Sequence, residues 1–164
     1  MTPDDPRVRQ FLTRSMTMRV ATLSASGVPH LTPLRFIHDG RAIYALTRGT
    51  SPAVRHIRQQ PGVVLLLDAE RPTGPVLRLR AHAAVRGEPQ LRGWWERRAA
   101  TKYFLRPGGL WNMLRHWRNL PTWARTRRSA MPADTVLIEF VPEAAEFVPR
   151  PSAGEVGRVQ GGCA

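Results

Sequence analysis

The chain has 164 residues, a formal net charge of +13 and a single cysteine, Cys163. One cysteine excludes an internal disulfide, no apolar run is long enough to span a bilayer, and the first residues lack the apolar stretch of a secretion signal. We therefore expect one cytoplasmic domain with an appendage.

Short apolar runs separated by turn formers predict an antiparallel sheet with a few small helices. Asp4 or Asp5 can cap a first helix that has Pro6 in its first turn and ends near Arg14. A second helix is expected at residues 52–60, and strands at residues 17–24, 28–38, 41–47, 63–68, 76–86 and 135–141. Pro142 is expected to end or bend the last strand, with pairing resumed at Phe147 and Val148.

Two glycine turns connect the first three strands. Ser26-Gly27 and Asp39-Gly40 each lie between apolar runs, and glycine supplies the positive φ that a tight hairpin needs. The continuous apolar run at residues 63–68 predicts a strand buried on both faces. These strands are numerous enough for the sheet to close into a barrel.

Strand 76–86 carries Arg78, Arg80 and His82 on one face. Burying these charges inside a barrel would be costly, so we expect this face to meet solvent, a ligand or a partner subunit.

Residues 89–128 form a Trp- and Arg-rich appendage. Residues 91–130 hold ten basic residues, one acid and all five tryptophans, and Pro107-Gly108-Gly109 separates a helical pattern up to Lys102 from a second helix at 110–120. The charge is typical of a segment with an anionic partner, although a solvated basic helix face explains it equally well. We expect the tryptophans to pack as core or as a lid over a substrate. The tail from Pro149 lacks apolar residues and is expected to be disordered.

The succession ATLSASGVPHLTPLRFIHDGRAIYALTRGTSPAVRHIRQQPGVVLLLD, followed by VLRLRAHAAV, resembles the pyridoxamine 5′-phosphate oxidase-like family. The resemblance covers about residues 17–89 and depends on the order of the pieces. It implies a mainly β fold with α-helices: a split β-barrel of about six antiparallel strands with flanking helices. The barrel domain would span residues 1–148, with a helical insertion at about 90–128.

The resemblance also implies a homodimer that binds FMN, or alternatively a 5-deazaflavin, at the subunit interface. Its phosphate would lie where the third strand ends and the second helix begins, because a helix N-terminus offers N–H donors and a positive dipole end. The flavin ring would lie against the second strand. Carried over to this sequence, the cofactor-binding residues are Pro33, Arg35, Phe36, Thr47, Arg48, Ser51, Arg55 and Arg80.

Two departures from the family pattern concern this site. Ala53 stands where many members carry a lysine, and Ala81-His82 stands where Gly-Arg is common. Arg55 would have to substitute for the lysine, although arginine and lysine are not equivalent at a phosphate. A member without a cofactor therefore remains open.

The function implied is that of an oxidoreductase that transfers hydride between the flavin and a small organic substrate. We name no catalytic residue, because the cofactor itself carries the chemistry. The alternatives are a flavin or heme carrier or sensor without turnover, and a binder of anionic partners through the appendage. Nucleic acid ranks last, since the strands lack a pattern of aromatic and basic residues. The five histidines have no metal-ligand spacing, so no zinc site is expected.

Overall fold

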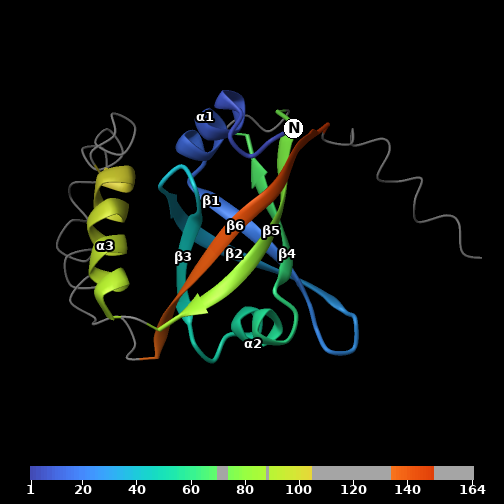
Figure 1. Cartoon of the computed structure of the whole chain (residues 1–164), viewed down its shortest axis with the longest axis vertical. Helices are drawn as coiled ribbons and strands as arrows, with labels where there is room; N and C mark the ends of the chain where they lie inside the picture. Colours follow the sequence, from blue (N-terminus) through green and yellow to red (C-terminus); the bar gives the residue numbers. More distant parts are fainter. Residues whose placement is uncertain (70–73, 88, 105–133, 150–164) are drawn as a thin grey trace, which may run out of the picture.

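The computed structural model describes residues 1–69, 74–87, 89–104 and 134–149. Within them lie three helices and six antiparallel strands, which confirms the predicted mainly β fold with helices (Figure 1). The helices are α1 (Pro6–Arg14), α2 (Pro52–Gln59) and α3 (Pro89–Phe104), and the strands are β1 (Thr17–Leu23), β2 (Pro29–His38), β3 (Ile43–Arg48), β4 (Gly62–Asp68), β5 (Val76–Arg86) and β6 (Thr135–Val148).

The strands close into a barrel in the order β1-β2-β3-β6-β5-β4. Helices α1 and α2 lie at opposite ends of this barrel, and α3 lies alongside it (Figure 1). Val8 and Leu12 from α1 and Val54 and Ile57 from α2 join the barrel's buried core. The two short helices thus close the ends of the barrel with their apolar faces.

Local sequence signals account for the turns and caps. Gly27 and Gly40 have φ values of 77° and 97°, which confirms the two predicted glycine hairpins. Asp5 caps α1 by accepting a 2.8 Å hydrogen bond from the Arg7 N–H. Ser51 caps α2 by accepting one from the Val54 N–H at 3.4 Å.

The prediction was right in part for two strands. β6 does not end at Pro142 but continues to Val148, with a register shift opposite Arg80 and Ala81. The pairing predicted for Phe147 and Val148 is confirmed, since they pair with Leu77 and Val76. In β4, Val64 and Leu66 are only half-buried, so one protomer alone does not bury both faces of this strand. Their face is the outer wall of the barrel, which no described helix covers.

Trp95 fastens α3 to the outer wall of the barrel. Its indole is 8% exposed, packs with Ile37 and Leu137, and donates a 3.1 Å hydrogen bond to the Tyr44 carbonyl. Partial burial and a hydrogen bond to Asp39 raise the pKa of the Tyr44 hydroxyl to about 12. The predicted packing role is therefore confirmed for this tryptophan.

Lys102, the only lysine in the chain, makes the second attachment of α3. Its Nζ donates to the carbonyls of Leu12 and Phe36, at 3.2 Å each, and lies 3.5 Å from the centre of the Phe36 ring. It therefore joins α3 to both α1 and β2. The predicted helix at 110–120, the tail after Pro149, and Trp111, Trp117 and Trp123 lie outside the described residues.

Candidate functional site

The ladder between β2 and β3 is short. It consists of three pairs and stops at Phe36 and Ala45. Beyond this point, residues 29–34 of β2 have ladder partners only in β1, and Leu46, Thr47 and Arg48 of β3 only in β6, as far as the described strands show. The barrel wall is therefore split between the first half of β2 and the second half of β3.

The start of α2 lies at the β3 side of this split. The loop before it is held to the beginning of β6, because the Gly49 N–H donates to the Asp134 carbonyl at 2.7 Å and the Thr50 hydroxyl to its carboxylate at 3.2 Å. A Cβ at Gly49 would lie 2.9 Å from that carbonyl oxygen, so only glycine fits. The loop thus holds the start of α2 in a fixed place.

Two cations stand beside this helix start. Arg48, the last residue of β3, and Arg55, in the first turns of α2, are both exposed, while Thr47 is half-buried and Ser51 serves as the cap. The structure therefore brings these four predicted residues into one short segment. Exposed guanidinium groups are suited to an anion. The helix start itself offers no accessible N–H, because Pro52 has none and Ala53 and Val54 are fully buried.

The predicted residues on β2 do not all face the same way. Pro33 and Arg35 are exposed on the outer face, whereas Phe36 is fully buried in the barrel core. Successive side chains of a strand point to opposite faces, so Phe36 cannot present its ring to a ligand outside the barrel. Its carbonyl also accepts the Lys102 hydrogen bond. The Phe36 side chain therefore belongs to the core, and a cofactor contact at this position would have to come from its backbone.

Arg80 is exposed, as predicted for its face of β5, but it lies far from the split. Register places Leu31, Ala21, Val64 and Arg80 in one row across β2, β1, β4 and β5. Three strand spacings separate Leu31 from Arg80, which is about 14 Å. Arg80 therefore does not join the other predicted residues within one protomer.

Ala53 has no exposed surface. It belongs to the face of α2 that packs on the core, whereas Arg55 belongs to the exposed face. A side chain at position 53 thus points away from the surface where the phosphate is expected. The absence of a lysine there removes no exposed charge from the helix start.

His56 was missed as part of the site. It is 3% exposed, its Nδ1 lies 3.0 Å from the Thr22 hydroxyl of β1, and the ring of His30 lies 4.8 Å away, centre to centre. The signal was present in the sequence, because positions 53, 56 and 57 share one helix face. His56 thus anchors α2, and with it the helix start, to β1.

Acid is expected to weaken this anchor. Burial lowers the pKa of His56 below its usual 6.5, and the neighbouring His30 and Arg55 lower it further. The unfolded chain then binds the proton more readily than the folded one. The contribution of His56 to the free energy of unfolding is therefore fully present above pH 6.5. It is lost as the pH falls from there towards the pKa of His56 in the folded protein. Urea midpoints measured at pH 7.5 and pH 5.0 should show this loss.

The matched variants are His56→Asn, which keeps a polar atom near the Thr22 hydroxyl, and His82→Asn at an exposed position. The first should flatten the pH dependence and the second should leave it unchanged. Equal slopes in the wild-type protein and His56→Asn would contradict the assignment.

No three His, Cys, Asp or Glu side chains gather as a metal site would require in the parts of the chain that the structure describes. No described helix is both long and apolar enough to cross a membrane.

The barrel resembles several solved structures. A putative pyridoxamine 5′-phosphate oxidase from Listeria innocua has a TM-score of 0.59 and 17% identity, over 88% of this chain and 96% of that one. An F420 reductase has a TM-score of 0.58 and 18% identity, over 84% of this chain and 94% of that one. HutZ, a heme storage protein from Vibrio cholerae, has a TM-score of 0.60 and 16% identity, over 87% of this chain and 93% of that one. At these identities the likeness concerns the fold alone.

No curated protein matches the sequence. The family model of pyridoxamine 5′-phosphate oxidase, however, matches residues 4–149, which is most of the chain. The barrel, its split wall and this match lead to one conclusion: the chain belongs to the pyridoxamine 5′-phosphate oxidase family.

Proposed function

We propose that this protein is a cytoplasmic, homodimeric oxidoreductase that binds FMN, or alternatively a 5-deazaflavin, within the unit of residues 1–148. The observation that carries the proposal is the split between β2 and β3, with the start of α2 and two exposed arginines at its edge. Family membership supports a flavin as the ligand.

The residues present fit such a cofactor. Its phosphate would accept hydrogen bonds from Arg48 and Arg55, with Thr47 and Ser51 beside them. The ring would lie along residues 29–34 of β2 and against Pro33 and Arg35, because the backbone there has ladder partners on one side only. A bound flavin would supply hydride transfer to a small organic substrate, and the protein would supply orientation and charge.

A titration tests the proposal. Purified protein is titrated with FMN, with riboflavin and with a 5-deazaflavin, and flavin fluorescence is followed. We expect one FMN per protomer and binding at least tenfold tighter than that of riboflavin, because riboflavin lacks the phosphate that two arginines would contact. Equal affinities for FMN and riboflavin would contradict the phosphate site, and binding of none of the three would contradict the function.

A second candidate is a carrier of heme or flavin without turnover. It is favoured by the likeness to a heme storage protein, and His30 and His82 are exposed histidines that an iron could reach. An intense visible band on addition of hemin, lost in His30→Ala or His82→Ala, would support this function. A flavin that a nicotinamide donor reduces, with no response to hemin, would exclude it.

The dimer interface is proposed for the outer face of β1, β2 and β4. This face carries Leu23 and Leu31, exposed by 40% and 60%, together with Pro33 and the half-buried Val64 and Leu66. This face is largely apolar, although Arg19 lies between Pro33 and Leu66 and pairs with Asp68. An apolar face of this kind is typical of a covered surface.

Leu31→Asp is therefore expected to weaken the dimer by about 30-fold or more, the effect of losing an interface hot spot of at least 2 kcal/mol. Sedimentation at several protein concentrations measures this change. Thr101→Asp, at an exposed position of α3, is the control and should leave the dimer intact. A monomeric wild-type protein would contradict the interface.

A further inference from the structure

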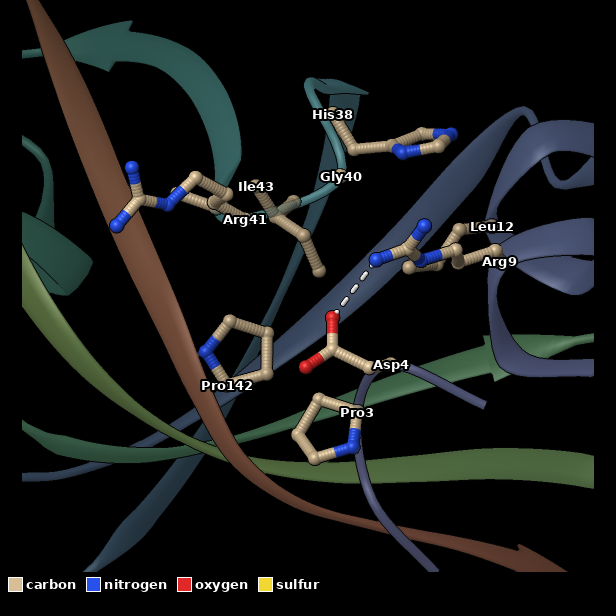
Figure 2. A pocket seen from close by; sticks show the side chains of 10 residues that line it. Pro3, Asp4, Arg9, Leu12, His38, Gly40, Arg41, Ile43 and Pro142 are labelled. Carbon is tan, nitrogen blue, oxygen red and sulfur yellow. Dashed lines mark hydrogen bonds and ion pairs between the residues drawn. The ribbon is translucent and has the colours of Figure 1, made fainter. Parts of the chain in front are cut away.

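A second cavity lies at the other end of the barrel from α2. It has a volume of about 240 Å³ and lies between the segment before α1, the turn from β2 to β3, and β6 (Figure 2). The ten residues that line it are Pro3, Asp4, Arg9, Leu12, His38, Gly40, Arg41, Ala42, Ile43 and Pro142. None of these residues belongs to the proposed flavin site.

The walls of this cavity combine charged side chains with apolar ones. Pro3 and Pro142 face it from two sides, and Ile43 and Leu12 contribute buried aliphatic surface (Figure 2). Proline lacks an N–H and has a fixed φ, so the two prolines offer flat contact surface without a backbone donor. Such walls favour a planar apolar group.

One ion pair crosses the cavity. The Asp4 carboxylate accepts a 2.9 Å hydrogen bond from the Arg9 guanidinium, and both side chains are largely exposed. In Figure 2 the Arg41 guanidinium points away from this pair, and the His38 ring lies on the Arg9 side of it. The Nε2 of His38 is 3.1 Å from the Thr13 hydroxyl. The Arg9 guanidinium is therefore the one directed at the cavity. It is already paired with a carboxylate of the same chain, that of Asp4.

We propose that this cavity binds a small aromatic carboxylate, whose carboxylate replaces Asp4 on Arg9 and whose ring lies between Pro3, Pro142 and Ile43. The guanidinium fits a carboxylate in a planar, two-bond arrangement. An exposed ion pair contributes only about 0–1 kcal/mol, so exchanging one carboxylate for another costs little. The net charge of +13 also favours the approach of an anion.

The size of the cavity limits the ligand. Sites for drug-sized molecules have volumes of roughly 300–1,000 Å³, and this one is smaller. The ligand is therefore a single-ring acid rather than a nucleotide or a flavin, and its binding does not depend on the proposed flavin function.

Benzoate is the probe, with acetate, inorganic phosphate and benzyl alcohol as comparisons. Amide shifts of the full-length protein are followed by NMR during each titration. We expect benzoate to shift the amides of Arg9, Ala42 and Ile43, and to bind more tightly than acetate or phosphate, which lack the ring, and than benzyl alcohol, which lacks the charge.

Two substitutions should change benzoate affinity in opposite directions. Asp4→Asn removes the competing carboxylate and should tighten binding by up to about fivefold. Arg9→Gln removes the receiving cation and should weaken benzoate binding by about fivefold. Arg7→Gln, an exposed arginine of the same helix outside the cavity, is the matched control and should have no effect. Weaker or unchanged binding in Asp4→Asn, shifts spread over the basic surface, or phosphate binding as tight as that of benzoate would overturn the proposal.

Discussion

Replacing Trp95 with alanine is expected to lower the free energy of unfolding by about 3–5 kcal/mol, the usual cost of removing a large buried aromatic side chain. The indole is almost fully buried between α3 and the wall formed by Ile37 and Leu137. Its removal leaves a cavity and also takes the N–H donor from the Tyr44 carbonyl. Urea unfolding, followed by circular dichroism, measures the loss.

Two further variants separate packing from hydrogen bonding. Trp95→Phe keeps most of the apolar volume. Its free energy of unfolding should fall by only about 1–2 kcal/mol, mainly because the hydrogen bond to the Tyr44 carbonyl is lost. Trp94→Ala should cost less than Trp95→Ala, because Trp94 is only half-buried and packs edge-on against Tyr44 at 5.0 Å. A loss below about 1 kcal/mol in Trp95→Ala would show that α3 does not depend on this contact.

Loss of the two arginines beside α2 is expected to have the largest effect on cofactor binding. Each hydrogen bond to a charged phosphate contributes about 1.5–3 kcal/mol, so Arg48→Gln and Arg55→Gln should each weaken FMN binding by roughly 10- to 100-fold. Riboflavin affinity should change little, because riboflavin has no phosphate. Isothermal titration with both ligands measures the two effects side by side.

Arg58→Gln is the matched control for these variants. Arg58 lies on the same helix, is exposed, and belongs to the last turn rather than the first. If Arg58→Gln weakened FMN binding as much as Arg55→Gln, the general positive charge would attract the cofactor and the helix start would not be its site. Unchanged FMN affinity in Arg48→Gln would likewise contradict the assignment.

Features that depend on close neighbours in the sequence were predicted correctly. The positive φ values of Gly27 and Gly40, the Ser51 cap and the bounds of β5 all follow from a few adjacent residues. The exposed arginines of β5 follow from the cost of burying charge. These features need no knowledge of distant parts of the chain.

Features that depend on distant pairing were missed. β6 passes through Pro142 with a register shift in its ladder with β5: Arg80 and Ala81 pair with Ala144 and Pro142, so Glu143 is the extra residue. The inward direction of Phe36 depends on the phase of β2 within the barrel. The separation of Arg80 from the other site residues depends on the two strands that lie between β2 and β5. The attachment of α3 by Trp95 and Lys102 likewise involves partners far away in the sequence.

The position of β6 within the sheet has a consequence for how the chain folds. This strand comes last among the described strands, yet it lies between β3 and β5. Until it is synthesised, the earlier strands have two open edges, and the barrel cannot close. Such long-range pairing slows folding, and open strand edges invite pairing with other chains. During translation, a nascent chain that ends before Thr135 should therefore be a substrate for chaperones, and protection from aggregation should begin once β6 has left the ribosome.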